Sequence, residues 1–177
     1  MNKLVILGAG GFGRTVADVA RQLGRYAEVC HLDDKPGEGV VGPLAGFEEH
    51  ISEGTEFFVA FGNNALRLEW LKRIEEVGGR LATLVHPTAY VSPEASVEPG
   101  SIVMPMAVVN TSVRVERGCI INCGCIIDHG CIIEEGCHIC LGAIVKAENR
   151  IASLSKIEAG VIIQNRTFTV GKKEKTF

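Results

Sequence analysis

The sequence predicts two architectures in one chain: a small parallel α/β domain over residues 1–85, then a parallel β-helix over residues 86–168, ending in a basic tail at 169–177. Two observations support this division. In the first part, short apolar runs alternate with amphipathic segments, as in βαβ units. In the second part, Val or Ile recurs at every sixth residue, a period that fits neither an α-helix nor an ordinary strand.

The composition is that of an ordinary globular protein. Of the 177 residues, 46% are hydrophobic and 22% are charged, and the net charge is −3. This balance argues against a nucleic acid or an anionic membrane as partner. No apolar run approaches the ~18 residues that a membrane span needs. The seven cysteines and the lack of an export signal predict free thiols in a reducing cytoplasm.

The first domain is expected to contain four strands and two helices. Strands are predicted at 3–7, 27–32, 56–61 and 81–85. The first helix follows the first strand, and its apolar face consists of Val16, Val19, Ala20 and Leu23, with Gly24 at its end. The second helix is expected at about 65–77. Strands that alternate with helices in this way predict a parallel sheet.

A glycine-rich turn connects the first strand to the first helix. The run from Gly8 to Gly13 matches G-x-G-x-x-G, and the acidic pair Asp33-Asp34 follows about twenty residues later. Such glycines allow the backbone to approach a phosphate at a helix N-terminus. Only about four strands precede the β-helix, which is the mononucleotide half of a dinucleotide fold. A Rossmann-like half domain that binds a nucleotide-sugar diphosphate therefore fits better than an NAD domain.

The second domain carries an unbroken series of thirteen aliphatic residues. They are Val91, Val97, Val103, Val109, Val115, Ile121, Ile127, Ile133, Ile139, Val145, Ile151, Ile157 and Ile163. Pro or Gly recurs between them, where a corner needs special backbone angles. The pattern predicts hexapeptide repeats, with three faces in each coil of eighteen residues and coils stacked about 4.8 Å apart.

The stretch CGCIIDHGCIIEEGCHIC at 123–140 has the composition of a metal site, but its spacing argues otherwise. Cys119, Cys125, Cys131 and Cys137 occupy the small inward column of the repeat, where other turns have Ala, Ser or Val. A free cysteine behaves as a small hydrophobe, and these four would lie on successive faces. We therefore expect core residues and no metal. His129 and His138 should point outward, and imidazole can act as a base near neutral pH.

Several motifs give the chain a family resemblance. GAGGFGR at 8–14, LDD at 32–34, GNNALR at 62–67, HPTAYVS at 86–92 and INCGCIIDHGCII at 121–133 resemble the bacterial hexapeptide-repeat sugar acetyltransferases. These include the sialic acid O-acetyltransferases and the UDP-4-amino-sugar N-acetyltransferases of bacillosamine-type pathways. The resemblance implies a left-handed β-helix, a homotrimer, and acetyl-CoA bound in the groove between neighbouring subunits.

The resemblance also implies roles for individual residues. His129 would be the general base and His138 would contact the thioester carbonyl of acetyl-CoA, with Gly142 and Ala143 also at the cofactor. Asn122 would line the acceptor pocket, with Asp128 beside it. The UDP-linked amino sugar would bind to the first domain, through Gly8, Gly10, Gly11, Gly13, Arg14, Asp33, Asp34, Gly62, Asn63, Asn64 and Arg67. No metal and no NAD are implied.

The position directly after His129 departs from the family pattern. An acidic residue usually follows the catalytic histidine, whereas this chain has Gly130. Asp128, or a residue one coil away near Asn110 and Thr111, is a candidate to replace it. Three other functions stay open: a nucleotide-sugar-binding protein that has lost acetyl-CoA, a sugar O-acetyltransferase of the sialic acid type, and NAD-dependent chemistry.

Overall fold

The computed structural model describes residues 2–167 and divides into two compact units, with the boundary after Pro87. Each unit is described by itself. The predicted basic tail, with Lys172, Lys173 and Lys175, lies outside the described residues. Within the described part of the chain, no helix is long and apolar enough to cross a membrane.

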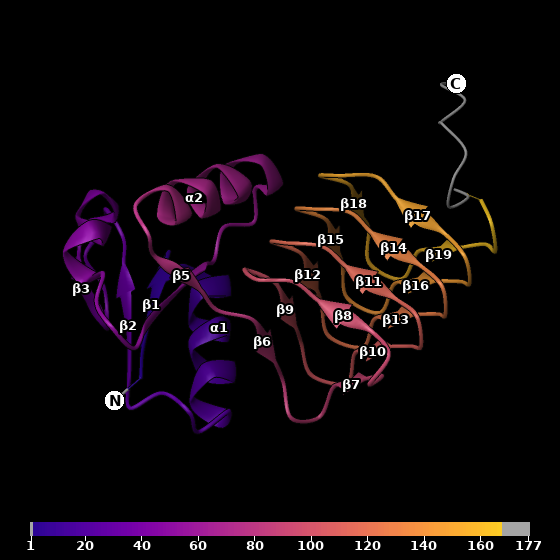
Figure 1. Ribbon diagram of the computed structural model, residues 1–177, viewed down its shortest axis with the longest axis horizontal. Helices are drawn as coiled ribbons and strands as arrows, with labels where there is room; N and C mark the ends of the chain where they lie inside the picture. The colour runs from indigo at the N-terminus through magenta and orange to yellow at the C-terminus, as the bar shows by residue number, and fades with distance from the viewer. Residues whose placement is uncertain (1, 168–177) are drawn as a thin grey trace. The chain divides into compact units, whose positions relative to one another are not determined.

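The first unit is a five-stranded parallel sheet with helices (Figure 1). The strand order is β3-β2-β1-β4-β5, so the connection from β3 returns across the sheet to place β4 beside β1. The elements are β1 (Lys3–Leu7), α1 (Gly11–Gln22), β2 (Glu28–Leu32), β3 (Val40–Gly42), the 3₁₀ helix η1 (Leu44–His50), β4 (Thr55–Val59), α2 (Asn64–Glu76), β5 (Arg80–Leu81) and β6 (Leu84–Val85). The Rossmann-like half domain is confirmed.

Two parts of this unit differ from the prediction. The strand expected over 81–85 is two short strands, β5 and β6, that are interrupted at Ala82 and Thr83. The sequence pattern also missed β3 and η1. β3 has only three residues and only two of them, Val40 and Val41, are apolar, so no alternation is long enough to detect.

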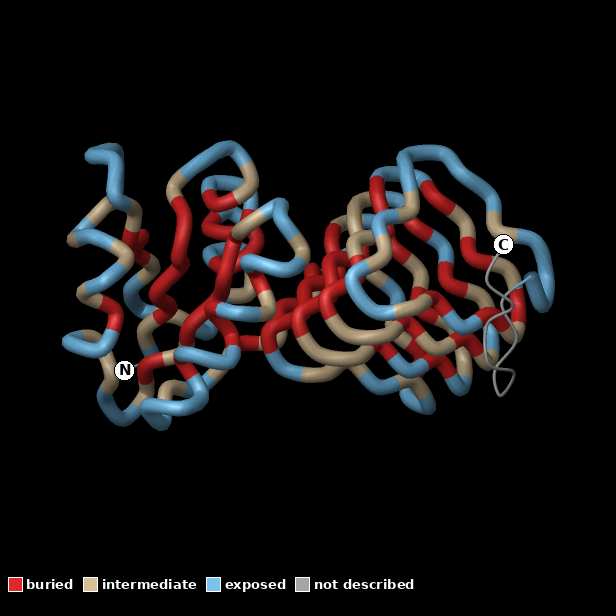
Figure 2. Tube along the Cα trace, turned by 90° about the horizontal axis from the view of Figure 1, so that it is seen from above, coloured by how far each residue is buried: buried red, intermediate tan, exposed pale blue. Residues whose placement is uncertain are grey.

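The second unit is a left-handed parallel β-helix of two-residue strands. They are β7 (Tyr90–Val91), β8 (Ser96–Val97), β9 (Ile102–Val103), β10 (Val108–Val109), β11 (Arg114–Val115), β12 (Ile120–Ile121), β13 (Ile126–Ile127), β14 (Ile132–Ile133), β15 (His138–Ile139), β16 (Ile144–Val145), β17 (Arg150–Ile151), β18 (Lys156–Ile157) and β19 (Ile162–Ile163). The second residue of every strand is the predicted aliphatic. Strands eighteen residues apart pair in register, and buried positions recur along each coil (Figure 2).

The turns between these strands use one left-handed position in every repeat. From residue 100 to residue 166, every sixth residue has a positive φ between 55° and 77°. Glycine occupies seven of the twelve positions, and Met106, Ser112, Glu148, Leu154 and Arg166 occupy the other five. The recurrent glycine of the sequence is therefore a backbone requirement of the corner, although other side chains adopt the conformation at a cost.

The inward column of small residues forms a ladder of hydrogen bonds inside the prism. Six of its members donate to the carbonyl oxygen fifteen residues later, at distances from 2.7 to 3.2 Å. They are Ser101, Cys119, Cys125, Cys131, Cys137 and Asn149. The cysteines are buried, as predicted, but they also bind the corner of the next coil. Burial raises the pKa of Cys125 to about 11, so its thiol stays protonated and remains a donor.

Cys125 provides a test of this ladder. Its Sγ donates to Cys140 O at 2.9 Å, and a serine would keep that donor while an alanine would not. We expect Cys125→Ala to lower the free energy of unfolding by about 1 kcal/mol, and Cys125→Ser to retain more stability than Cys125→Ala. Urea unfolding of both variants measures the difference. Equal loss in the two variants would show that the thiol only fills space.

Candidate active site

The first unit brings two predicted loops together at the carboxyl edge of its sheet. The glycine-rich turn follows β1 and the Ala60–Asn63 loop follows β4, its neighbour on the side where the strand order reverses. A Cβ on Gly8 would lie 3.2 Å from Phe61 Cε1 and 3.3 Å from Ala60 O, so the two loops are in contact. Such a switch point is where open α/β sheets bind nucleotides.

The glycines of the turn have two different roles. A Cβ on Gly13 would lie 2.1 Å from Gly8 O, so this glycine lets α1 pack against the end of β1. Gly10 is the N-cap of α1, and a Cβ on Gly10 or Gly11 would meet nothing within 4 Å. These two positions leave open space at the helix N-terminus, where a phosphate is favoured. Arg14 is exposed in the same first turn.

The acidic pair after β2 is bound to neighbouring backbone. Asp33 accepts a hydrogen bond from Ala9 N at 2.8 Å and another from Lys35 N at 2.9 Å. These N–H groups, that of Ala9 first, hold the pKa of the Asp33 carboxyl below its usual range. Asp34 accepts from Leu44 N at 3.1 Å. Asp33 therefore fixes the glycine-rich turn from β2.

The GNNALR segment begins α2 and lies partly inside the unit. Asn63 caps the helix, because its side chain accepts from Leu66 N at 2.9 Å. Arg67 is fully buried and donates to Phe61 O at 2.9 Å and to Asn64 Oδ1 at 3.0 Å. Gly62 is exposed. The structure thus places Arg67 beneath the loop, where it holds Phe61 and Asn64 in position.

In the β-helix, His129 and Asp128 form a hydrogen-bonded pair at one corner. His129 Nδ1 lies 2.9 Å from Asp128 Oδ1, which also accepts from His129 N at 2.7 Å. Asn110, one coil earlier, donates to the same oxygen at 3.4 Å. These contacts, the His129 N–H first, lower the pKa of Asp128. The neutral ring thus carries its proton on Nδ1 and leaves Nε2 unprotonated.

Asn122 and His138 form a second pair, which the sequence did not predict as a contact. Cys123 N donates to Asn122 Oδ1 at 2.9 Å, which turns the amide nitrogen towards His138 Nε2 at 3.2 Å. Because the amide nitrogen donates, Nε2 accepts and the ring proton lies on Nδ1, which is buried. In this state His138 presents no exposed N–H to a ligand.

The other predicted cofactor residues lie one coil above Asn122 and Cys123. Gly142 adopts φ +64° with open space around it, and its N–H donates to Cys123 O at 3.0 Å. The side chain of Ala143 is fully buried, so a ligand would contact this turn at Gly142.

The Asp128–His129 and Asn122–His138 pairs belong to different corners, since Asp128 follows β13 and Asn122 follows β12. Within residues 2–167, no group of three or more His, Cys, Asp or Glu side chains is placed to hold a metal ion.

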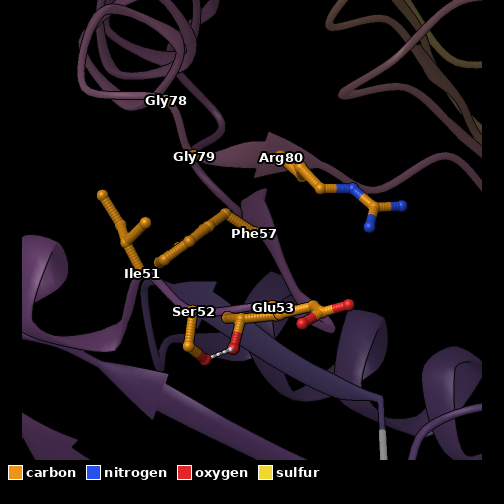
Figure 3. Close-up of a pocket in the computed structure, with 8 residues that line it drawn as sticks. Ile51, Ser52, Glu53, Phe57, Gly78, Gly79 and Arg80 are labelled. Carbon is orange, nitrogen blue, oxygen red and sulfur yellow. Dashed lines mark hydrogen bonds between the residues drawn. The ribbon is translucent and has the colours of Figure 1, made fainter.

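The structure also contains a hollow of about 320 Å³ at the opposite edge of the first sheet (Figure 3). It is lined by Ile51, Ser52, Glu53, Thr55, Phe57, Gly78, Gly79 and Arg80. Apart from Phe57 in the middle of β4, these residues lie at or before the amino ends of β4 and β5, whereas the glycine-rich turn lies at the carboxyl end of β1. The hollow is therefore separate from the predicted nucleotide-sugar site.

The Asp128 carboxylate is expected to matter for activity and for pH dependence. Asp128→Asn keeps an acceptor oxygen but removes the charge that would stabilise an imidazolium, so we expect kcat to fall roughly 10²-fold, less than when a buried partner is replaced.

Because the folded-state pKa of Asp128 is lowered, its stabilising contribution is present near neutral pH and is lost as pH falls below about 4. Thermal unfolding of the wild type and of Asp128→Asn between pH 3 and pH 7 measures this loss of stability. A stability difference that grew towards low pH would contradict it.

Comparison with known proteins adds three findings. A family model described as the PglD N-terminal domain matches residues 3–74. The acetyltransferase domain of PglB from Neisseria gonorrhoeae FA1090, alone or in complex with acetyl coenzyme A, is 35% identical with a TM-score of 0.90, and the match covers 94% of this chain and 84% of that chain. PerB from Caulobacter crescentus, in complex with CoA and GDP-perosamine, has a TM-score of 0.62 at 21% identity and 93% and 92% coverage, which is a likeness of fold.

Proposed function

Because the chain belongs to the hexapeptide-repeat sugar N-acetyltransferases, we propose that it transfers the acetyl group of acetyl-CoA to the 4-amino group of a UDP-linked amino sugar. The chain is an acetyl-CoA-dependent acyltransferase. The UDP group is taken from the family resemblance, and the observation that carries the proposed base is the Asp128–His129 pair. In that pair one ring nitrogen is held by a carboxylate and the other remains free to take a proton.

In the proposed reaction, His129 acts on the amine. The amine nitrogen attacks the thioester carbonyl carbon, and the N–C bond forms while the carbonyl π electrons move to oxygen. His129 Nε2 takes a proton from the ammonium, and Asp128 stabilises the imidazolium. Collapse of the tetrahedral intermediate breaks the C–S bond, and the CoA thiolate leaves and takes up the proton that His129 Nε2 accepted, which restores the neutral imidazole. The chain contributes alignment of amine, thioester and base.

The first unit is proposed to hold the nucleotide part of the substrate. The open space at Gly10 and Gly11 and the exposed Arg14 suit a diphosphate at the start of α1. Asp33 and Arg67 are proposed to act from within, by fixing the two loops, because their polar atoms bind backbone and side chains of those loops. This geometry supports a nucleotide-sugar diphosphate as the ligand.

His138 is proposed to meet the acetyl-CoA thioester only after a local change. A hydrogen bond from His138 Nε2 to the carbonyl oxygen needs a proton on that nitrogen, which the Asn122 amide now prevents. We propose that the Asn122–His138 hydrogen bond opens on acetyl-CoA binding. Gly142, with open space at its α-carbon, would lie at the same cofactor.

A homotrimer with the active site between subunits is proposed from the surface of the β-helix. The outward residues of one sheet are all apolar: Tyr90, Val108, Ile126, Ile144 and Ile162. Tyr90 is 54% exposed and Ile162 is 49% exposed, so this face lacks a covering element in the described chain. The Asp128–His129 and Asn122–His138 pairs lie at different corners, so a neighbouring copy is needed to bring one of each together. Sedimentation equilibrium at three times the mass of the chain would support the trimer, and a monomer would refute it.

A thiol-release assay tests the proposed function. Purified protein with acetyl-CoA should release free CoA when a UDP-4-amino sugar is added, and not when the corresponding UDP-4-hydroxy sugar is added. Release with the hydroxy sugar instead would identify an O-acetyltransferase. Calorimetric binding of the UDP-sugar without binding of acetyl-CoA would identify a binding protein. Quenching of NADH fluorescence would point to NAD chemistry.

A further inference from the structure

The turn that follows His129 is covered by a side chain of the next coil. Glu148 lies eighteen residues after Gly130, at a left-handed turn with φ +59°, and its N–H donates to His129 O at 3.0 Å. Its Cγ lies 3.5 Å from the place that a Cβ on Gly130 would occupy. A carboxylate side chain therefore lies over the turn where the chain itself has no side chain.

A cation from one coil further binds this carboxylate. Arg166 Nε lies 2.5 Å from Glu148 Oε2, and both side chains contact solvent. The Arg166 hydrogen bond is the main reason that the pKa of Glu148 is lowered, and the charge of His129 contributes in the same direction. Glu148 is thus ionised, and its charge and that of His129 interact through space.

Other charged groups near His129 are held by partners of their own. In the preceding coil, the Thr111 hydroxyl donates to Glu94 Oε2 at 2.7 Å. In the following coil, Lys146 Nζ donates to Gln164 Oε1 at 2.7 Å. Asp128 is the carboxylate of this corner that forms a hydrogen bond with the His129 ring.

We propose that Arg166 sets the basicity of His129, by neutralising the Glu148 carboxylate that lies over Gly130. This rests on the proposed role of His129 as the base. Glu148 and Arg166 are then positioning residues, which act on the imidazole in addition to the Asp128 carboxylate to which it is hydrogen bonded. Removing Arg166 leaves the Glu148 carboxylate over Gly130 uncompensated, and removing Glu148 leaves the Arg166 cation without its carboxylate. The two single changes must therefore act in opposite directions.

The test is an NMR titration of the His129 ring, with its signal assigned by loss in His129→Gln. Arg166→Gln should raise the midpoint of the titration by about 0.3 pH unit at low salt, because the freed carboxylate stabilises the imidazolium. Glu148→Gln should lower it by a similar amount, and the double variant should return to the wild-type midpoint. The pH at which kcat/KM falls on the acid side of its pH profile should shift in the same direction as the NMR midpoint of that variant. Added salt should reduce all shifts.

The Arg150–Glu134 ion pair provides the matched control, since it is of the same type but belongs to a different corner. Arg150→Gln should leave the His129 midpoint unchanged. Single variants that leave the midpoint unchanged, or that move it in the same direction, would overturn the proposal. The NMR midpoints measure the effect of the Glu148–Arg166 pair on the His129 ring, whether or not that ring is the base. The activity of His129→Ala tests the role of His129 as the base separately.

Discussion

His129→Ala is expected to lower kcat by about 10²–10⁴-fold, because it removes the proposed general base. The side chain is 52% exposed, and its ring contacts Asp128 and not the core, so the fold should be kept. Steady-state kinetics with acetyl-CoA and the UDP-4-amino sugar measures the loss. The KM for the UDP-sugar should change little, because the first unit is proposed to bind the nucleotide.

His50 provides a matched control, since it is a histidine at the end of η1 in the first unit. His50→Ala should keep the wild-type rate. Added imidazole should partly restore the rate of His129→Ala if the ring acts as a base. Full activity in His129→Ala would exclude the base assignment, and loss of activity without rescue or with loss of thermal stability would point to a structural role.

Gly13→Ala is expected to destabilise the first unit by about 3 kcal/mol or more. The added Cβ would lie 2.1 Å from Gly8 O and 2.9 Å from Gly8 C, and backbone atoms cannot move away as a flexible side chain can. Either α1 or the end of β1 must shift, which would also displace the glycine-rich turn. Urea unfolding and calorimetric UDP-sugar binding should therefore both show the loss.

Gly11→Ala separates packing from binding in the same turn. Gly11 is the first residue of α1, and a Cβ there would meet nothing within 4 Å. This variant should be as stable as the wild type or more stable, by up to about 1 kcal/mol. A loss of UDP-sugar affinity in such a stable variant would show that the diphosphate approaches Gly11. Equal stability of Gly13→Ala and Gly11→Ala would contradict the packing argument.

The β-helix could be predicted because its rule is local. Each strand ends on an aliphatic whose neighbours, six residues away, obey the same rule, so the positions from Val91 to Ile163 all agree with the structure. β3 and η1 were not predicted because neither carries a periodic pattern of apolar residues. The contacts with β2 that place them are tertiary.

The site was only partly predictable for a related reason. The Asp128–His129 contact joins neighbours in sequence and was among the alternatives considered for the missing acidic residue. The position of Glu148 over Gly130 depends on the stacking of coils, and only a count of eighteen residues from Gly130 would have indicated it. The donor ladder of Cys125 and its equivalents crosses between coils with a spacing of fifteen, which no pattern in the sequence reveals.

The stacking of identical coils has a kinetic consequence for the base. A repeat that contacts only its nearest neighbours opens from its ends, so local unfolding begins at the last coil and propagates inward. The corner that carries Asp128 is the third of five, with Ser92 and Asn110 before it and Lys146 and Gln164 after it. Unfolding from the C-terminal end must therefore open two coils before it reaches His129, and the proposed base keeps its orientation while the last coil opens and closes.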